Sequence, residues 1–76
     1  MSKKIKLDPF TATMIAEGEP ELAGISEDEL TEELYLKAWQ YLVDTGLAWS
    51  LQGSFGRTAT ALIEEGLIKP KGVSNE

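Results

Sequence analysis

The chain has 76 residues, a formal net charge of −6, and neither cysteine nor histidine. This length allows one domain with a modest core, because a second core could not bury enough apolar surface to offset the entropy of ordering it. The two missing residue types exclude disulfides, thiolate or imidazole metal sites, cysteine nucleophiles and any triad with imidazole as the base. We therefore expect a single domain over residues 1–76 with no metal and no cofactor.

Acidic side chains are concentrated in the body of the chain. Residues 7–68 carry twelve of the 13 acids against Lys37 and Arg57, whereas the ends are basic, with three lysines in residues 1–6 and two in residues 69–76. Such a body repels a phosphate backbone, so direct binding of duplex nucleic acid is not expected, and a basic protein is the favoured partner. No apolar stretch follows the basic start, so the sequence predicts no signal peptide and no membrane span. A cytoplasmic location is therefore expected.

Helix-start and helix-end signals define the first two expected helices. Asp8 is a good cap and is followed by a proline, which is favoured in a first turn, so a short helix is expected at about residues 9–17. Ser26 and the glutamate three positions later have the spacing of a capping box, which predicts a second helix at about 27–45. In both cases a glycine after the last apolar run marks the end of the helix.

A third helix is expected at about residues 54–65, where another apolar run ends at a glycine. The preceding segment 47–53 fits either a further helical turn or a loop. Flexible ends are expected at about residues 1–6 and 70–76. The predicted fold is all-α, a small bundle of these three helices that self-associates.

The second expected helix is apolar around an unusually wide arc. Its apolar side chains spread over about 240°, whereas a surface helix needs an apolar stripe of little more than 100°. One interpretation is a surface left for self-association or a partner protein; the other is that the shorter helices and the segment after residue 46 cover the arc. Aromatic residues are common anchors at interfaces. The expected interaction residues are Tyr35, Leu36, Trp39, Val43 and Trp49.

The start of the third helix is the most site-like stretch of the sequence. Gly53, Ser54, Gly56 and Arg57 would combine close backbone approach, helix-start amides and a guanidinium, which predicts a candidate site for an anionic small molecule or nucleotide. The spacing is not that of a phosphate-binding loop. The simpler interpretation is that the glycines permit a turn and a close helix contact, with Arg57 paired to an acid.

Residues 17–33 hold eight acids and no base. A solvated linker and a helix start explain such a run, but the same carboxylates would also imitate nucleic-acid phosphates in the basic groove of another protein. Nothing in the sequence pairs an acid with a base for proton transfer, so we do not expect an enzyme.

Residues 7–11 and the longer stretches 38–59 and 62–68 resemble a family of small uncharacterised proteins from tailed bacteriophages. The motifs that carry the resemblance are Asp-Pro-Phe-Thr near the start, then Ala-Trp-Gln-Tyr-Leu-x-Asp-Thr-Gly and Gln-Gly-x-Phe-Gly-Arg. The resemblance implies a context, a phage accessory protein in the host cytoplasm, and no residue role. This context and the residue patterns above together predict a non-enzymatic interaction module that self-associates and binds a host or phage protein. Its expected role is that of an inhibitor or adaptor of host machinery.

Overall fold

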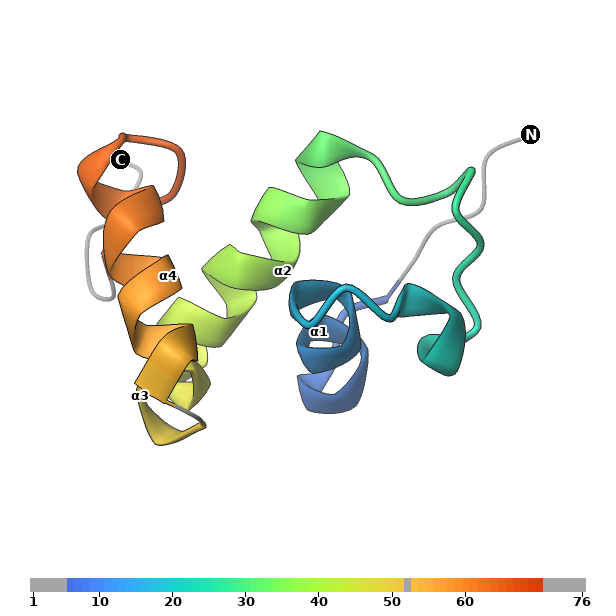
Figure 1. Ribbon diagram of the computed structural model, residues 1–76, viewed down its shortest axis with the longest axis horizontal. Helices are drawn as coiled ribbons and strands as arrows, with labels where there is room; N and C mark the ends of the chain where they lie inside the picture. The colour runs from blue at the N-terminus through green and yellow to red at the C-terminus, as the bar shows by residue number, and fades with distance from the viewer. Residues whose placement is uncertain (1–5, 52, 71–76) are drawn as a thin grey trace.

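The computed structural model describes residues 6–51 and 53–70, which form four α-helices and one short 3-10 helix, with no strand in these ranges (Figure 1). The all-α class is confirmed. The expected flexible ends, 1–6 and 70–76, lie outside the described residues except for Lys6 and Pro70. In chain order the elements are α1 (Pro9–Ala16), η1 (Pro20–Ala23), α2 (Glu32–Thr45), α3 (Leu47–Ser50) and α4 (Gly53–Glu64).

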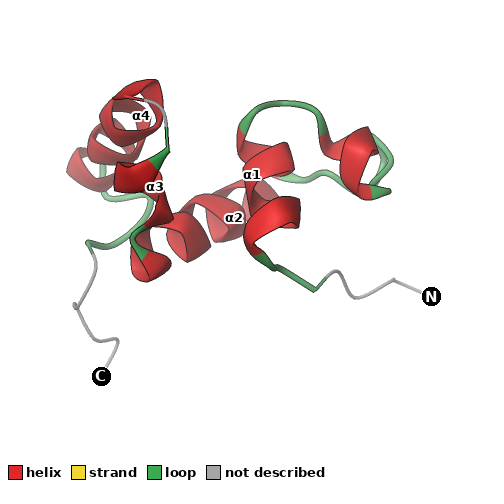
Figure 2. Cartoon of the chain, turned by 90° about the horizontal axis from the view of Figure 1, so that it is seen from below, coloured by secondary structure: helices red, strands yellow, loops and turns green. Residues whose placement is uncertain are grey.

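The helix α2 is the centre of the molecule. It contacts α1 on one side and α3 on the other, and α3 in turn packs against α4. Figures 1 and 2 show α1 and α4 lying over different parts of α2, with η1 and the loop that follows it beyond α1. Because α1 packs on α2 and the Phe55 ring of α4 contacts the Trp39 ring of α2, side chains of three helices meet between α1 and α4.

The boundaries of the two shorter expected helices are confirmed to within one residue at each end. The Asp8 carboxylate accepts a hydrogen bond from the Thr11 amide at 2.7 Å, which caps the start of α1. The chain leaves α1 through Gly18, whose φ of 84° is a left-handed conformation that favours glycine. These local signals therefore act as the sequence predicts.

The helix α2 begins later than predicted, at Glu32 rather than at about residue 27. The amide of Ser26 donates to the Glu29 carboxylate at 3.0 Å, and the Glu29 amide donates to the Ser26 carbonyl at 3.0 Å. These bonds close one isolated turn. The helix is capped instead by Thr31, whose hydroxyl accepts from the Leu34 amide at 3.1 Å.

Charge repulsion explains why the turn at Ser26 does not continue into α2. A helix running from residue 27 would place Asp28 four residues before Glu32, and Glu29 four residues before Glu33. Like charges at this spacing destabilise a helix. The break before the Thr31 cap removes this helical spacing between the four carboxylates.

In the segment 47–53, left open by the sequence, residues 47–50 form a short helix and Gly53 begins α4, while residue 52 lies outside the described residues. Gly46, with φ of 83°, ends α2, and the chain turns directly into α3. Leu51 is then extended, with φ of −82° and ψ of −155°. After this break α4 packs against α3.

Much of the apolar arc of α2 is covered within a single chain, which agrees with the second interpretation of this arc. Side chains from α1, Ile25, α3, α4 and Ile68 belong to the same core cluster as the buried side chains of α2. The sequence argument for excess surface counted two neighbouring helices, whereas these five segments share the core with α2. Of its apolar side chains, Ala38, Trp39, Leu42 and Val43 are buried, and Leu30, Leu34, Tyr35, Leu36 and Tyr41 are half-buried.

The segment after α4 is fastened to α2 by one side chain. The Gln40 amide group donates from Nε2 to the Lys69 carbonyl and accepts at Oε1 from the Lys69 amide, both at 2.8 Å. Beside this pair, Ile68 is 5% exposed and belongs to the core. The end of the described chain is therefore part of the fold.

Candidate functional site

A hollow of about 390 Å³ lies between the end of α1 and the start of α4. The helix α2 contributes one side chain to it, the indole of Trp39. Two acids from the α1 end and two hydroxyl groups from α4 make the lining mainly polar. The lining residues are Ala16, Glu17, Glu19, Trp39, Ser54, Phe55 and Thr58.

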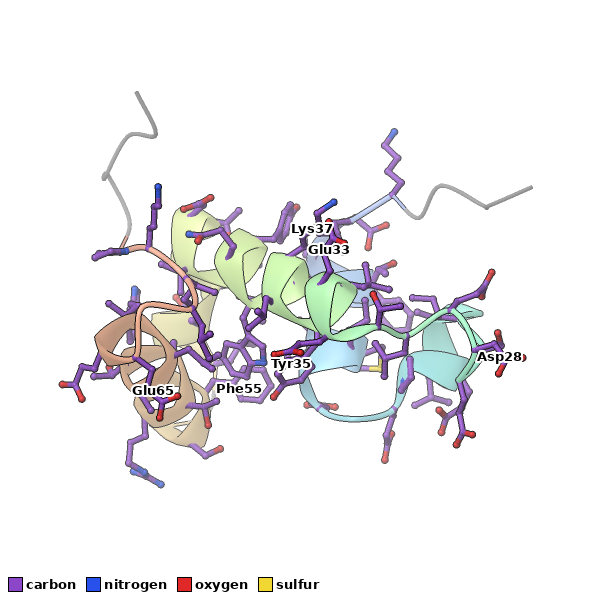
Figure 3. The ribbon with its side chains drawn as sticks, turned by 90° about the horizontal axis from the view of Figure 1, so that it is seen from above. Asp28, Glu33, Tyr35, Lys37, Phe55 and Glu65 are labelled. Carbon is purple, nitrogen blue, oxygen red and sulfur yellow. The ribbon has the colours of Figure 1, made fainter. Side chains whose placement is uncertain are left out.

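Three aromatic rings stand in a row beside this hollow. The Trp39 ring lies 5.3 Å from that of Phe55, with a tilt of 43°, and 6.4 Å from that of Tyr35 in an edge-on arrangement. In Figure 3, Phe55 extends from α4 toward the centre of the molecule, where Tyr35 lies. Such contacts stabilise the aromatic pairs beyond their buried area and fix the position of the indole.

The indole nitrogen of Trp39 has no hydrogen-bond acceptor among the described residues. The side chain is only 2% exposed. A buried donor without an acceptor costs about 1–3 kcal/mol, and buried tryptophans usually direct this N–H to an acceptor. This is the one buried side-chain polar atom without a partner in residues 6–51 and 53–70, and it belongs to a residue that lines the hollow.

The two ends of the hollow differ in charge. Glu17 and Glu19 are exposed, and neither forms an ion pair within the described part of the chain. They stand at the C-terminal, partly negative end of α1, whereas Ser54 stands at the N-terminal, partly positive end of α4. The α1 end therefore attracts a cation and the α4 end attracts a hydrogen-bond acceptor.

The residues expected to form an interaction surface are divided between the core and the surface. Trp39 and Val43 are buried in the core, although Trp39 also lines the hollow, and Tyr35 and Leu36 are half-buried. Trp49 is 50% exposed. Its ring packs over Gly56, where an added Cβ would lie 3.2 Å from Trp49 Cε3.

The residues of the expected anion site do not meet at one point. Ser54 lines the hollow beside Trp39, whereas Gly53, Gly56 and Arg57 line a separate groove of about 530 Å³ next to Trp49. The close contact of Gly56 with Trp49 agrees with its simpler interpretation. The other part of that interpretation is not observed, because Arg57 is exposed and forms no ion pair with the residues described.

The acidic segment 17–33 faces outward. Seven of its eight acids are exposed, and Glu29 is half-buried. One of them, Glu33, pairs with Lys37 at 3.5 Å along α2. Asp28 lies at the far end of the molecule from Phe55 (Figure 3). The acids therefore form a broad field around η1 and the start of α2, and only Glu17 and Glu19 reach the hollow.

The described residues also bear on two further kinds of site, metal clusters and membrane-spanning helices. No group of three or more Asp or Glu side chains there is placed to hold a metal ion. None of the helices has both the length and the apolar character needed to cross a bilayer. Reasoning from sequence did not identify the unpartnered Trp39 N–H, because nothing in the sequence shows whether an indole N–H finds an acceptor.

The fold and the hollow define a small helical protein with an acidic surface and a polar, aromatic-lined site. Residues 20–76 match the model of a family described as a domain of unknown function (DUF7417), and with this share of its length covered the chain belongs to that family. The match begins at η1 and includes α2, α3 and α4. No curated protein and no solved structure matches the chain.

Proposed function

We propose that the protein is a non-enzymatic interaction module that binds a basic segment of another protein. The observation that carries this proposal is the outward position of the acids in 17–33, seven of which are exposed. Among the described residues, Lys37 is the one base that pairs with any of these seven. A surface of one sign speeds association with a partner of opposite sign and excludes partners of like sign.

The biological setting we propose is phage infection. The resemblance to small proteins of tailed bacteriophages supports a phage accessory protein that acts in the host cytoplasm as an inhibitor or adaptor of host machinery. A host protein with a basic nucleic-acid groove is a fitting target, because exposed carboxylates occupy such a groove as phosphates would. Duplex DNA should then compete with this protein for its target.

The direct test is fluorescence anisotropy with the full chain and a labelled twelve-residue peptide in which arginine alternates with glycine and serine. Binding is expected at low salt, with an affinity that falls about tenfold as the Debye length shortens from about 30 Å to about 8 Å. The same peptide with every arginine replaced by glutamine is the control and should not bind. Failure of the arginine peptide to bind at low salt would refute the proposed function.

Self-association is a second proposal, and it rests on Trp49. This half-exposed ring borders the groove along α4, where Arg57 and Glu64 stand on either side of Ala61. An antiparallel pairing of two α4 helices about Ala61 would bring Arg57 of one copy toward Glu64 of the other, so the groove complements a second copy of itself.

Light scattering coupled to size-exclusion chromatography tests this pairing. A dimer is expected at high micromolar concentration, and Trp49→Ser should convert it to a monomer. Leu22→Ser is the matched control, because Leu22 is exposed on η1, away from this groove. A wild-type chain that stays monomeric would overturn the pairing without affecting the binding of basic segments.

A further inference from the structure

The acidic turn after η1 and the groove beside Trp49 lie at opposite ends of the molecule. Figure 1 shows α3 and α4 at one end of the longest axis, and η1 with the loop that follows it at the other. In Figure 3, Glu65 and Asp28 mark the same two ends. The chain extends 32 Å along this axis. None of the residues that line the Trp49 groove belongs to the acidic segment 17–33, so a partner at one end leaves the other end free.

The outer face of α4 has room for a second copy of the chain. Phe55 directs the inner face of this helix into the core, whereas Arg57, Ala61 and Glu64 are exposed. Small side chains fill the groove between the two charged residues, which lets another helix approach closely. Beside them Trp49, 50% exposed, supplies apolar surface. This face therefore offers both an apolar anchor and a pair of unlike charges.

The charge pattern decides which ends of two copies can meet. The groove is lined by one base and one acid, so an antiparallel pair of α4 helices brings unlike charges together. At the other end, seven exposed acids of one copy would face the same seven of the next and repel them. Pairing through α4 keeps the two acidic ends much farther apart than the Debye length of about 8 Å at physiological ionic strength, so their repulsion is screened.

We propose that the protein, paired through α4, bridges two basic segments, one at each acidic end. A two-fold axis at the groove directs the acidic ends outward on opposite sides of the dimer. The inference rests on the proposed function, because each basic segment binds through its cationic groups to the exposed carboxylates. It adds that one dimer joins two partner chains, or two sites of one chain.

The size of the contact indicates which partners benefit most. A pairing over one twelve-residue helix and one indole is smaller than the standard interface of about 1,600 Å², so the pairing is weak. Basic segments that are held close together raise the effective concentration of the second copy and compensate for this weakness. Repeated or clustered basic segments are therefore the partners that a bridging dimer fits.

Beads densely coated with the arginine peptide described above test the bridge with the full chain. At high micromolar concentration the wild type should cluster the beads, which is measured as a rise in turbidity. Trp49→Ser should bind the beads equally well and leave them dispersed. This variant has the net charge of the wild type, so neutralisation of the beads does not explain a difference between the two. Beads coated with the glutamine peptide should stay dispersed.

The outcomes separate the bridge from the proposed function. Wild-type protein that binds the beads without clustering them would overturn the bridge and leave the binding of basic segments intact. A folded Trp49→Ser variant that clusters the beads as the wild type does would have the same meaning. Absence of binding to the arginine beads would instead refute the proposed function.

A charge swap tests the antiparallel pairing on which the bridge depends. Arg57→Glu leaves acids at both charged positions of the groove, and Glu64→Arg leaves bases at both. Each variant alone should self-associate at least about tenfold more weakly than the wild type, because like charges then meet across the interface. An equimolar mixture of the two pairs unlike copies and should restore clustering, with the mean net charge of −6 that the wild type has. If both variants are folded by circular dichroism and their mixture clusters the beads no better than either alone, the bridge is overturned.

Discussion

Replacing Gln40 with alanine should detach the last described segment from α2. The substitution removes both 2.8 Å hydrogen bonds between Gln40 and Lys69, and the contact of Gln40 Nε2 with Asp44 at 3.0 Å. Each hydrogen bond contributes about 0.5–1.5 kcal/mol net, and these groups are solvent-exposed, so the low end applies. We expect the free energy of unfolding to fall by about 1.5 kcal/mol, a large share of the stability of a domain of this size.

Urea denaturation followed by circular dichroism measures this change. With a slope of about 1 kcal/mol per molar urea, the midpoint should fall by about 1.5 M, and Tm should fall by about 6–12 °C. Asp44→Ala is the control, because it removes only the contact within α2 and should change the stability by less than about 0.5 kcal/mol.

A double variant tests the mechanism of this stabilisation. Ile68→Ala alone should cost about 2–4 kcal/mol, since Ile68 is 5% exposed. Because Gln40 and Ile68 hold the same segment, the double variant should lose less than the sum of the two single losses. Full additivity, or a Gln40→Ala midpoint equal to that of the wild type, would refute the view that Gln40 fastens this segment.

Three further predictions concern the helices. Thr31→Ala should cost about 1 kcal/mol of stability in urea denaturation, and Ser26→Ala clearly less, if α2 is capped at Thr31. Gly56→Ala should stabilise the chain by about 0.5 kcal/mol and shift Trp49 emission to the red, because alanine favours the helix and the half-exposed ring can tilt away from the new Cβ. The Thr11 amide donates to the Asp8 carboxylate and so holds the pKa of that carboxyl below its ordinary value of 3.8. The stabilisation that ionised Asp8 gives to the fold should therefore be present above pH 3.8 and be lost as the pH falls through the lowered pKa. Asp8→Ala should lack this acid-dependent loss of stability.

The helix boundaries that sequence predicts best are those fixed by one residue's own backbone. Asp8 before Pro9 starts α1, and Gly46 ends α2 with φ of 83°, because the conformational preference of each residue decides the local geometry. The start of α2 was predicted wrongly for a different reason. The capping pair of Ser26 and Glu29 does form, but a cap stabilises whatever turn follows it and does not fix how far the helix extends.

The coverage of α2 could not be read from the sequence, because it depends on segments with no periodic pattern of their own. Ile25 lies in a loop, and Ile68 follows the end of α4, yet both are buried in the core. The short α3 adds Ala48 in the same way. Counting only regular helices underestimates the area that turns and ends can cover in a chain of 76 residues.

The hollow, like the coverage of α2, arises from the tertiary arrangement and could not be predicted from the sequence. Glu17, Trp39 and Ser54 come from three separate helical regions, and only the placement of α1 and α4 over different parts of α2 brings them together. The sequence did indicate the start of α4 as a site, because glycine, serine and arginine occur together there. It did not indicate the surroundings of this helix start, because the hollow that Ser54 lines also contains carboxylates from the end of α1, while Arg57 lines a separate groove. Whether a helix start can attract an anion therefore depends on the charges that lie near it, and here Glu17 and Glu19 line the same hollow as Ser54.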